Sequence, residues 1–140
     1  MYGFLYGFFL APFVRTLYYN SMQAYQLTTD GWERSLSERV IEFLEQRYRS
    51  QIGLRDVAEA FGYSPYYLTS AFARSTGLPI TAWIVKRRIG AAQRLLGESD
   101  TSVAAACEAV GFNDVCYFTR QFVRYTGVTP GRFRSVHRGN

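Results

Sequence analysis

The sequence is rich in arginine, whose side chain is well suited to binding phosphate. It holds 16 basic residues against 11 acidic ones, and every basic residue except Lys86 is an arginine. A guanidinium group binds two phosphate oxygens at once, whereas the ammonium group of lysine acts as a point charge. With a net charge of +5, this bias favours a partner that carries many phosphates.

Residues for other chemistry are scarce. The two cysteines, Cys107 and Cys116, cannot form a disulfide framework, and no histidine lies near them in the sequence to complete a zinc site. The single histidine, His137, has no serine or carboxylate placed to form a catalytic triad. We therefore expect no metal, no cofactor and no enzymatic activity, and a protein of the reducing cytoplasm.

The spacing of apolar residues predicts an all-α fold. Hydrophobic residues make up 48% of the 140 residues, enough for the core of one domain. A helix is expected to begin at Ser35, which forms a capping box with Glu38. Its apolar face consists of residues four apart, namely Leu36, Val40, Leu44 and Tyr48. Further helices are expected at 54–61, at 65–76 and, as a long one, at 80–96.

A pattern of residues then occurs a second time. The first copy opens with Leu54, Val57, Ala58 and Gly62, and 49 residues later the second opens with Val103, Ala106, Cys107 and Gly111. The first continues as Leu68, Phe72, Gly77 and Trp83, and the second, 50 residues later, as Phe118, Phe122, Gly127 and Phe133. Each copy predicts a short helix, a turn at a glycine with positive φ, and a longer helix, which together form a helix-turn-helix. Two helical hairpins that merely pack together are the alternative interpretation.

Three stretches of the sequence resemble a known family. They read LRDVAEAFGYSPYYLTSAFARSTG, WIVKRRIGAAQRLL and SVAAACEAVGFNDVCYFTRQFVRYTGVTPGRFR, and over about residues 35–136 they are similar to the DNA-binding domain of AraC/XylS-type transcription regulators. The resemblance implies about seven helices, with two helix-turn-helix subdomains joined by a long linking helix across residues 33–140. The recognition helices, at about 65–76 and 114–126, would then enter successive major grooves on one face of the DNA.

The resemblance also implies which residues contact DNA. The family's base-reading positions fall on Tyr66, Thr69 and Ser70 in the first copy and on Val115, Cys116, Thr119 and Arg120 in the second. Arg120 is the best candidate, because arginine bound to guanine is the commonest specific contact, although a phosphate contact or a surface ion pair is the alternative. The predicted phosphate contacts, or else solvated charges, are Arg74, Arg124, Arg132 and Arg134. Of the basic residues on the linking helix, Arg88 matches a family arginine and is either a DNA contact or a structural anchor.

Some positions depart from the family pattern. Ser70 stands where arginine is common, so the first recognition helix is expected to read DNA shape or a thymine methyl group through Tyr66. Pro79 and Ile80 replace the usual capping residue and proline, which predicts a slightly shifted start of the long helix. Cys116 replaces a serine as a small residue, or else acts as a redox switch at the start of a helix.

Residues 1–32 form a separate, apolar and aromatic extension. They contain 10 of the 24 aromatic residues but only two charges, Arg15 and Asp30. The apolar run of the first 14 residues is too short to span a membrane. From Phe13 to Leu27 the apolar residues have the spacing of one helix face. We expect a helix that packs against a second copy or a missing upstream domain. Packing on its own domain and binding to a membrane surface are the alternatives.

The expected function is that of a transcription regulator bound to promoter DNA. By resemblance it would be an activator that recruits RNA polymerase; an architectural or accessory protein that bends DNA without contacting polymerase is the alternative. The chain would then be either a truncated product of a longer regulator or a standalone one controlled by its abundance. The sequence does not specify the target site, the effector or the oligomeric state.

Overall fold

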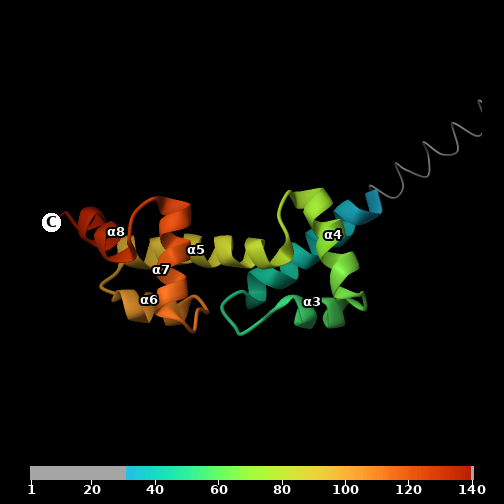
Figure 1. The fold of residues 1–140 in the computed structure, drawn as a ribbon, viewed down its shortest axis with the longest axis horizontal. Helices are drawn as coiled ribbons and strands as arrows, with labels where there is room; N and C mark the ends of the chain where they lie inside the picture. The colour runs from blue at the N-terminus through green and yellow to red at the C-terminus, as the bar shows by residue number, and fades with distance from the viewer. Residues whose placement is uncertain (1–30, 140) are drawn as a thin grey trace, which may run out of the picture.

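The structure of the protein is a computed structural model that describes residues 31–139. This part of the chain is entirely helical, with seven helices and no strand, as predicted. The helices are residues 31–47, α3 (Leu54–Phe61), α4 (Pro65–Thr76), α5 (Ile80–Glu98), α6 (Val103–Ala109), α7 (Val115–Thr126) and α8 (Pro130–His137). α5 lies along the long axis of the molecule, with α3 and α4 at one end and α6, α7 and α8 at the other (Figure 1). The predicted helix within residues 13–27 lies outside the described residues.

The helix of residues 31–47 begins earlier than predicted. Residues 31–34 are already helical, so Ser35 lies inside the helix and the expected capping box at Ser35 and Glu38 is wrong. Serine and glutamate are tolerated inside helices, so their spacing alone does not place a helix start. The predicted apolar face is correct, because Leu36, Val40, Leu44 and Tyr48 are all buried.

α5 joins two separate hydrophobic cores. Its first half contributes Ile80 and Ile84 to a core with the helix of residues 31–47, α3 and α4. Its second half contributes the apolar residues Ile89, Ala91, Ala92 and Leu96 to a core with α6 and α7. Each large side chain that is fully buried contributes about 1.5–3 kcal/mol to folding. The broad apolar surface of this helix is therefore explained by packing on two sides.

The duplication is visible in individual hydrogen bonds. In the first copy the Thr76 hydroxyl donates to the Phe72 carbonyl at 2.8 Å and lies 3.1 Å from the Leu78 carbonyl. In the second copy Thr126 makes the same contacts with Phe122 and Val128, at 2.7 and 3.0 Å. The helices α4 and α7 thus end in the same local structure, 50 residues apart.

The start of α5 does not shift as expected. α5 begins at Ile80, and α8 begins at Pro130, the equivalent residue of the second copy. Pro79 provides no side-chain hydrogen bond to α5; instead, the Ile80 N–H donates to the hydroxyl of Thr69 at 3.4 Å. A hydroxyl from α4 therefore replaces the missing cap.

Arg88 fixes the first interhelical loop to α5. Its Nε donates to the Tyr48 carbonyl at 2.6 Å and its Nη2 to the Ser50 carbonyl at 2.8 Å. Close by, Gln51 Nε2 donates to the Gly111 carbonyl at 3.0 Å, which ties the first interhelical loop to the second helix-turn-helix. Burial lowers the pKa of Arg88. Arg88 is thus a structural anchor, one of the two roles expected for it.

None of the helices within residues 31–139 combines the length and the apolar character that crossing a membrane requires.

Candidate DNA-binding surface

Both predicted recognition helices begin with a side-chain cap and are held by buried phenylalanines. Ser64 accepts a hydrogen bond from the Tyr67 N–H at 3.2 Å, and Asp114 accepts bonds from the N–H groups of Cys116 and Tyr117 at 2.8 and 3.2 Å. On the inner side the buried anchors are residues of the repeated pattern, namely Leu68 and Phe72 on α4 and Phe118 and Phe122 on α7. Because this side is fixed in the core, the opposite side of each helix faces solvent.

On α4 the predicted base-reading residues are short or aromatic. Tyr66 is 83% exposed and lies in the first turn, and Ser70 is partly exposed. Thr69 is also partly buried, and its hydroxyl accepts the Ile80 N–H. In the second copy Thr119 has no equivalent donor, because Pro130 lacks an N–H. The two threonines therefore differ in what their hydroxyls are able to bind.

On α7 the predicted residues present a longer and more varied surface. Val115, Cys116 and Arg120 are exposed, and Thr119 is partly exposed. Cys116, Arg120 and Arg124 follow at intervals of four and so share one face of the helix. Sequence reasoning missed Val123, which is 38% exposed and lies one turn beyond Arg120. An exposed valine beside a base-reading position was recognisable from the register of the helix.

The four arginines predicted to bind phosphate divide into two pairs. Arg74 forms a two-pronged ion pair with Glu33, with distances of 2.7 and 3.2 Å, and its hydrogen bond lowers the pKa of the Glu33 carboxyl. Arg134 Nε donates to the Thr101 carbonyl at 3.0 Å. Arg124 and Arg132 are exposed, and neither guanidinium forms a salt bridge within residues 31–139.

Glu33 was not foreseen as a partner of Arg74, because 41 residues separate the two in sequence. Nothing in the local pattern around either residue indicates the contact. It arises because residues 31–34 are helical and place Glu33 at the C-terminal end of α4.

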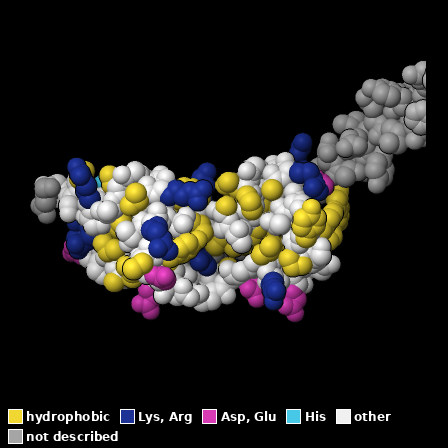
Figure 2. Space-filling view, in the orientation of Figure 1, with side chains coloured by type: hydrophobic (Ala, Val, Ile, Leu, Met, Phe, Trp, Pro, Cys, Tyr) yellow, Lys and Arg dark blue, Asp and Glu magenta, His cyan; other side chains and the backbone are white. Residues whose placement is uncertain are grey.

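Charges are unevenly distributed over the visible face of the molecule (Figure 2). The acidic side chains gather along the edge formed by α3 and α6, and the basic ones lie mostly along the opposite edge and over the half that contains α7 (Figures 1 and 2). A hydrophobic area covers much of the half that contains α4. On this face, the half with α7 therefore carries more of the charge that attracts phosphate.

The cysteines occupy different environments. Cys107 is buried in the second core, and burial raises the pKa of its thiol. Cys116 is exposed at the start of α7. Within residues 31–139 no three side chains of the types that bind metals gather at one place.

Comparison with known proteins agrees with this architecture. A family model described as a helix-turn-helix domain matches residues 57–135. The transcriptional activator NphR of Rhodococcus sp. is 37% identical over 100 residues, which cover 71% of this chain and 29% of NphR. The chain spans less than half the length of the curated relatives it matches.

Two solved structures have the same fold. The C-terminal domain of the response regulator yesN from Fusobacterium nucleatum is 30% identical, with a TM-score of 0.67 over 69% of this chain and 95% of that one. The DNA-binding domain of the transcriptional factor AdpA, solved with a target DNA, is 25% identical, with a TM-score of 0.69 over 73% of this chain and 92% of that one. The chain therefore belongs to the AraC/XylS family of helix-turn-helix transcription regulators.

Proposed function

We propose that the chain is a sequence-specific regulator that inserts α4 and α7 into successive major grooves on one face of double-stranded DNA. The proposal is supported by the two equivalent helices, each capped at its N-terminus and anchored by buried side chains on its inner face. α5 has 19 residues and is about 28 Å long at 1.5 Å per residue. Grooves on one face of DNA recur about every 34 Å, so one chain is large enough to reach two of them.

The observation that carries the proposal is the exposed face of α7. There Arg120 stands between Cys116 and Val123, it is exposed, and it forms no salt bridge within residues 31–139. A guanidinium in that position suits the two acceptor atoms of a guanine edge. On α4 the equivalent residue is Ser70, which is much shorter. We therefore propose that α7 supplies most of the base discrimination and α4 supplies a weaker contact through Tyr66.

We further propose that the protein activates transcription in the cytoplasm by contacting RNA polymerase. A relative that is named a transcriptional activator supports this direction. A purified transcription reaction with a promoter that carries the preferred site tests it, because an activator raises the amount of transcript. If the protein binds and bends that promoter without changing transcription, it acts as an architectural protein.

Replacement of Arg120 tests the base-reading role of α7. We expect Arg120→Ala to weaken binding to the preferred site by about 1–3 kcal/mol and to relax the preference at one base pair. The matched control is Arg124→Ala, one turn further along the same face, which should weaken all sequences alike. Fluorescence anisotropy with the preferred duplex, single-base variants of it and a random duplex measures both effects.

If Arg120→Ala lowers the affinity for preferred and random duplexes by the same factor, Arg120 binds phosphate and the proposed role is wrong. A preference that persists unchanged in both variants places base reading on other residues.

The apolar segment 1–32 leads to a proposal about assembly. Ten aromatic residues with only two charges would form a larger exposed apolar patch than is usual on a soluble monomer. We expect the 140-residue chain to self-associate, and a chain that begins at Gly31 to be monomeric and to bind DNA. The shorter chain retains both cores, whose buried residues all lie between Leu36 and Phe122. Sedimentation velocity of both chains measures this.

A full-length chain that sediments as a monomer would show that the segment covers its own domain. A shortened chain that no longer binds DNA would show that residues before Gly31 belong to the DNA-binding fold.

A further inference from the structure

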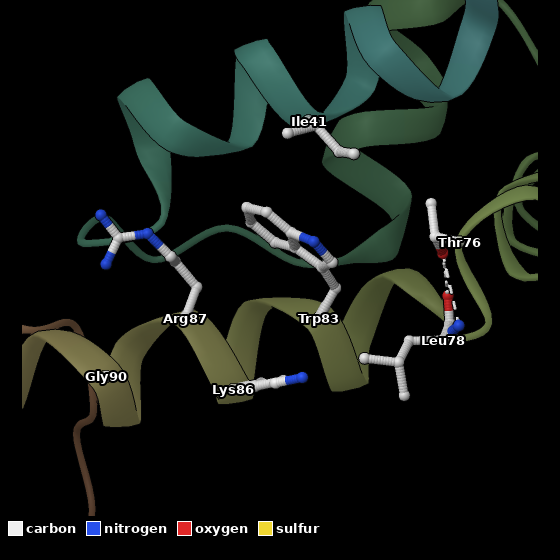
Figure 3. A pocket seen from close by; sticks show the side chains of 7 residues that line it. All are labelled: Ile41, Thr76, Leu78, Trp83, Lys86, Arg87 and Gly90. Atoms are coloured by element: carbon white, nitrogen blue, oxygen red, sulfur yellow. Dashed lines mark hydrogen bonds between the residues drawn. The ribbon is translucent and has the colours of Figure 1, made fainter. Parts of the chain in front are cut away.

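A groove lies beside the first half of α5, on a part of the molecule that contains none of the predicted base-reading residues. It has a volume of about 530 Å³ and runs between the helix of residues 31–47, the C-terminal end of α4 and α5 (Figure 3). We call it the Trp83 groove, and its lining includes Ile41, Thr76, Leu78, Trp83, Lys86 and Gly90.

The floor of the Trp83 groove is apolar. The indole of Trp83 lies between α5 and the helix of residues 31–47, near Ile41 (Figure 3). Trp83 and Ile41 pack against the first core but keep part of their surface in solvent. Leu78 is also only partly buried. A tryptophan in a concave apolar site is the type of residue that dominates protein interfaces, and an apolar floor does not suit a phosphate backbone.

Gly90 opens one end of the groove. It lies in the middle of α5, where glycine weakens a helix relative to alanine. A Cβ atom at this position would meet no atom within 4 Å, and the backbone does not have a positive φ. Neither packing nor backbone conformation within residues 31–139 therefore requires a glycine here. The missing side chain leaves room for the backbone of another molecule to approach α5 closely.

The rim of the groove has two basic residues, one of which is paired with a carboxylate within residues 31–139. Lys86 is exposed and forms no salt bridge within the described part of the chain. Arg87 also lines the groove, with its Nε bonded to Glu45 at 2.7 Å, and no carboxylate is among the lining residues. An apolar floor beside a positive rim is complementary to a segment that carries apolar and acidic side chains together.

We propose that the Trp83 groove binds an acidic amphipathic segment of a partner protein. An apolar side chain of this segment covers Trp83, a carboxylate lies at Lys86, and the backbone passes over Gly90. The contact goes beyond the proposed function, because none of the residues assigned to DNA lines the groove. The regulator is thus able to hold DNA and a protein at the same time.

A selection with random peptides displayed on phage tests the proposal on the full chain. We expect the enriched peptides to combine aspartate or glutamate with large apolar residues. Their binding is then measured as a change in the fluorescence of Trp83 in a Trp32→Phe background, which leaves Trp83 as the only tryptophan. Gly90→Leu, which fills the open end, should weaken binding by more than about tenfold.

Charge reversal supplies the matched comparison. Lys86→Glu should weaken the binding of the acidic peptides by about tenfold. Arg94 is an exposed residue of α5 outside the groove, and Arg94→Glu should leave this binding unchanged. Thermal unfolding of each variant checks that it is folded. The proposal is overturned if no peptide is enriched, if the enriched peptides are basic, or if Gly90→Leu leaves their binding unchanged. It is also overturned if duplex DNA competes with the peptides, because the groove would then belong to the DNA-binding surface.

Discussion

Gly111→Ala is expected to lower the free energy of unfolding by about 3–5 kcal/mol. Gly111 has a φ of 103°, and a Cβ atom there would lie 2.8 Å from the Arg49 carbonyl oxygen and 2.9 Å from that of Tyr48. Both obstacles are backbone atoms, so no side chain is able to rotate away. The Tyr48 carbonyl also accepts the hydrogen bond from Arg88, and its displacement would disturb the contact between the two subdomains. Urea unfolding followed by circular dichroism measures the loss.

The internal duplication provides the control. Gly62 occupies the equivalent turn of the first copy, with a φ of 74°, but a Cβ atom there would meet nothing within 4 Å. Gly62→Ala should therefore lower the free energy of unfolding by only roughly 1–2 kcal/mol, the strain of a non-glycine residue in the left-handed conformation. If the two variants are equally destabilised, the backbone at Tyr48 and Arg49 moves away from the new methyl group without a measurable loss of stability. The junction between the subdomains is then not rigid.

The helices of the fold were predictable because their ends carry local signals. α4 starts at Pro65 after a Ser64 cap and ends at Gly77, as serine, proline and glycine in those positions indicate. The start of the first described helix was not predictable in the same way. Ser35 and Glu38 imitate a helix start, but helical structure already exists four residues earlier. A local capping pattern does not show whether the residues before it are also helical, because this depends on what those residues pack against.

Contacts between side chains that are distant in sequence could not be predicted from the spacing of residues within each helix. The exposure of Tyr66, Val115 and Arg120 follows from the helix register, once the apolar face is assigned to the core. The pairing of Arg74 with Glu33 and of Arg134 with the Thr101 carbonyl depends on how separate helices meet. An arginine on an exposed face looks the same in sequence whether it binds phosphate or another part of the protein.

Strong salt dependence is the largest effect expected for DNA binding. If both recognition helices engage DNA and about 6–10 phosphates are neutralised, a plot of log K against log salt concentration should have a slope of about −5 to −9. Affinity would then fall about 10³–10⁵-fold between roughly 50 and 200 mM salt. Fluorescence anisotropy titrations of one duplex at several salt concentrations give the slope directly.

The size of the slope also shows how many helices bind. Contact through α7 alone would neutralise about half as many phosphates and give a slope of about −3. A slope of zero would exclude an arginine-lined DNA surface. Arg124→Gln should make the slope less steep by about 1.

Arg74→Gln has the same effect only if DNA draws Arg74 away from Glu33. In that case Glu33→Gln, which removes the competing carboxylate, should strengthen DNA binding. If neither change at this ion pair alters the slope or the affinity, Arg74 holds the helix of residues 31–47 and takes no part in DNA binding.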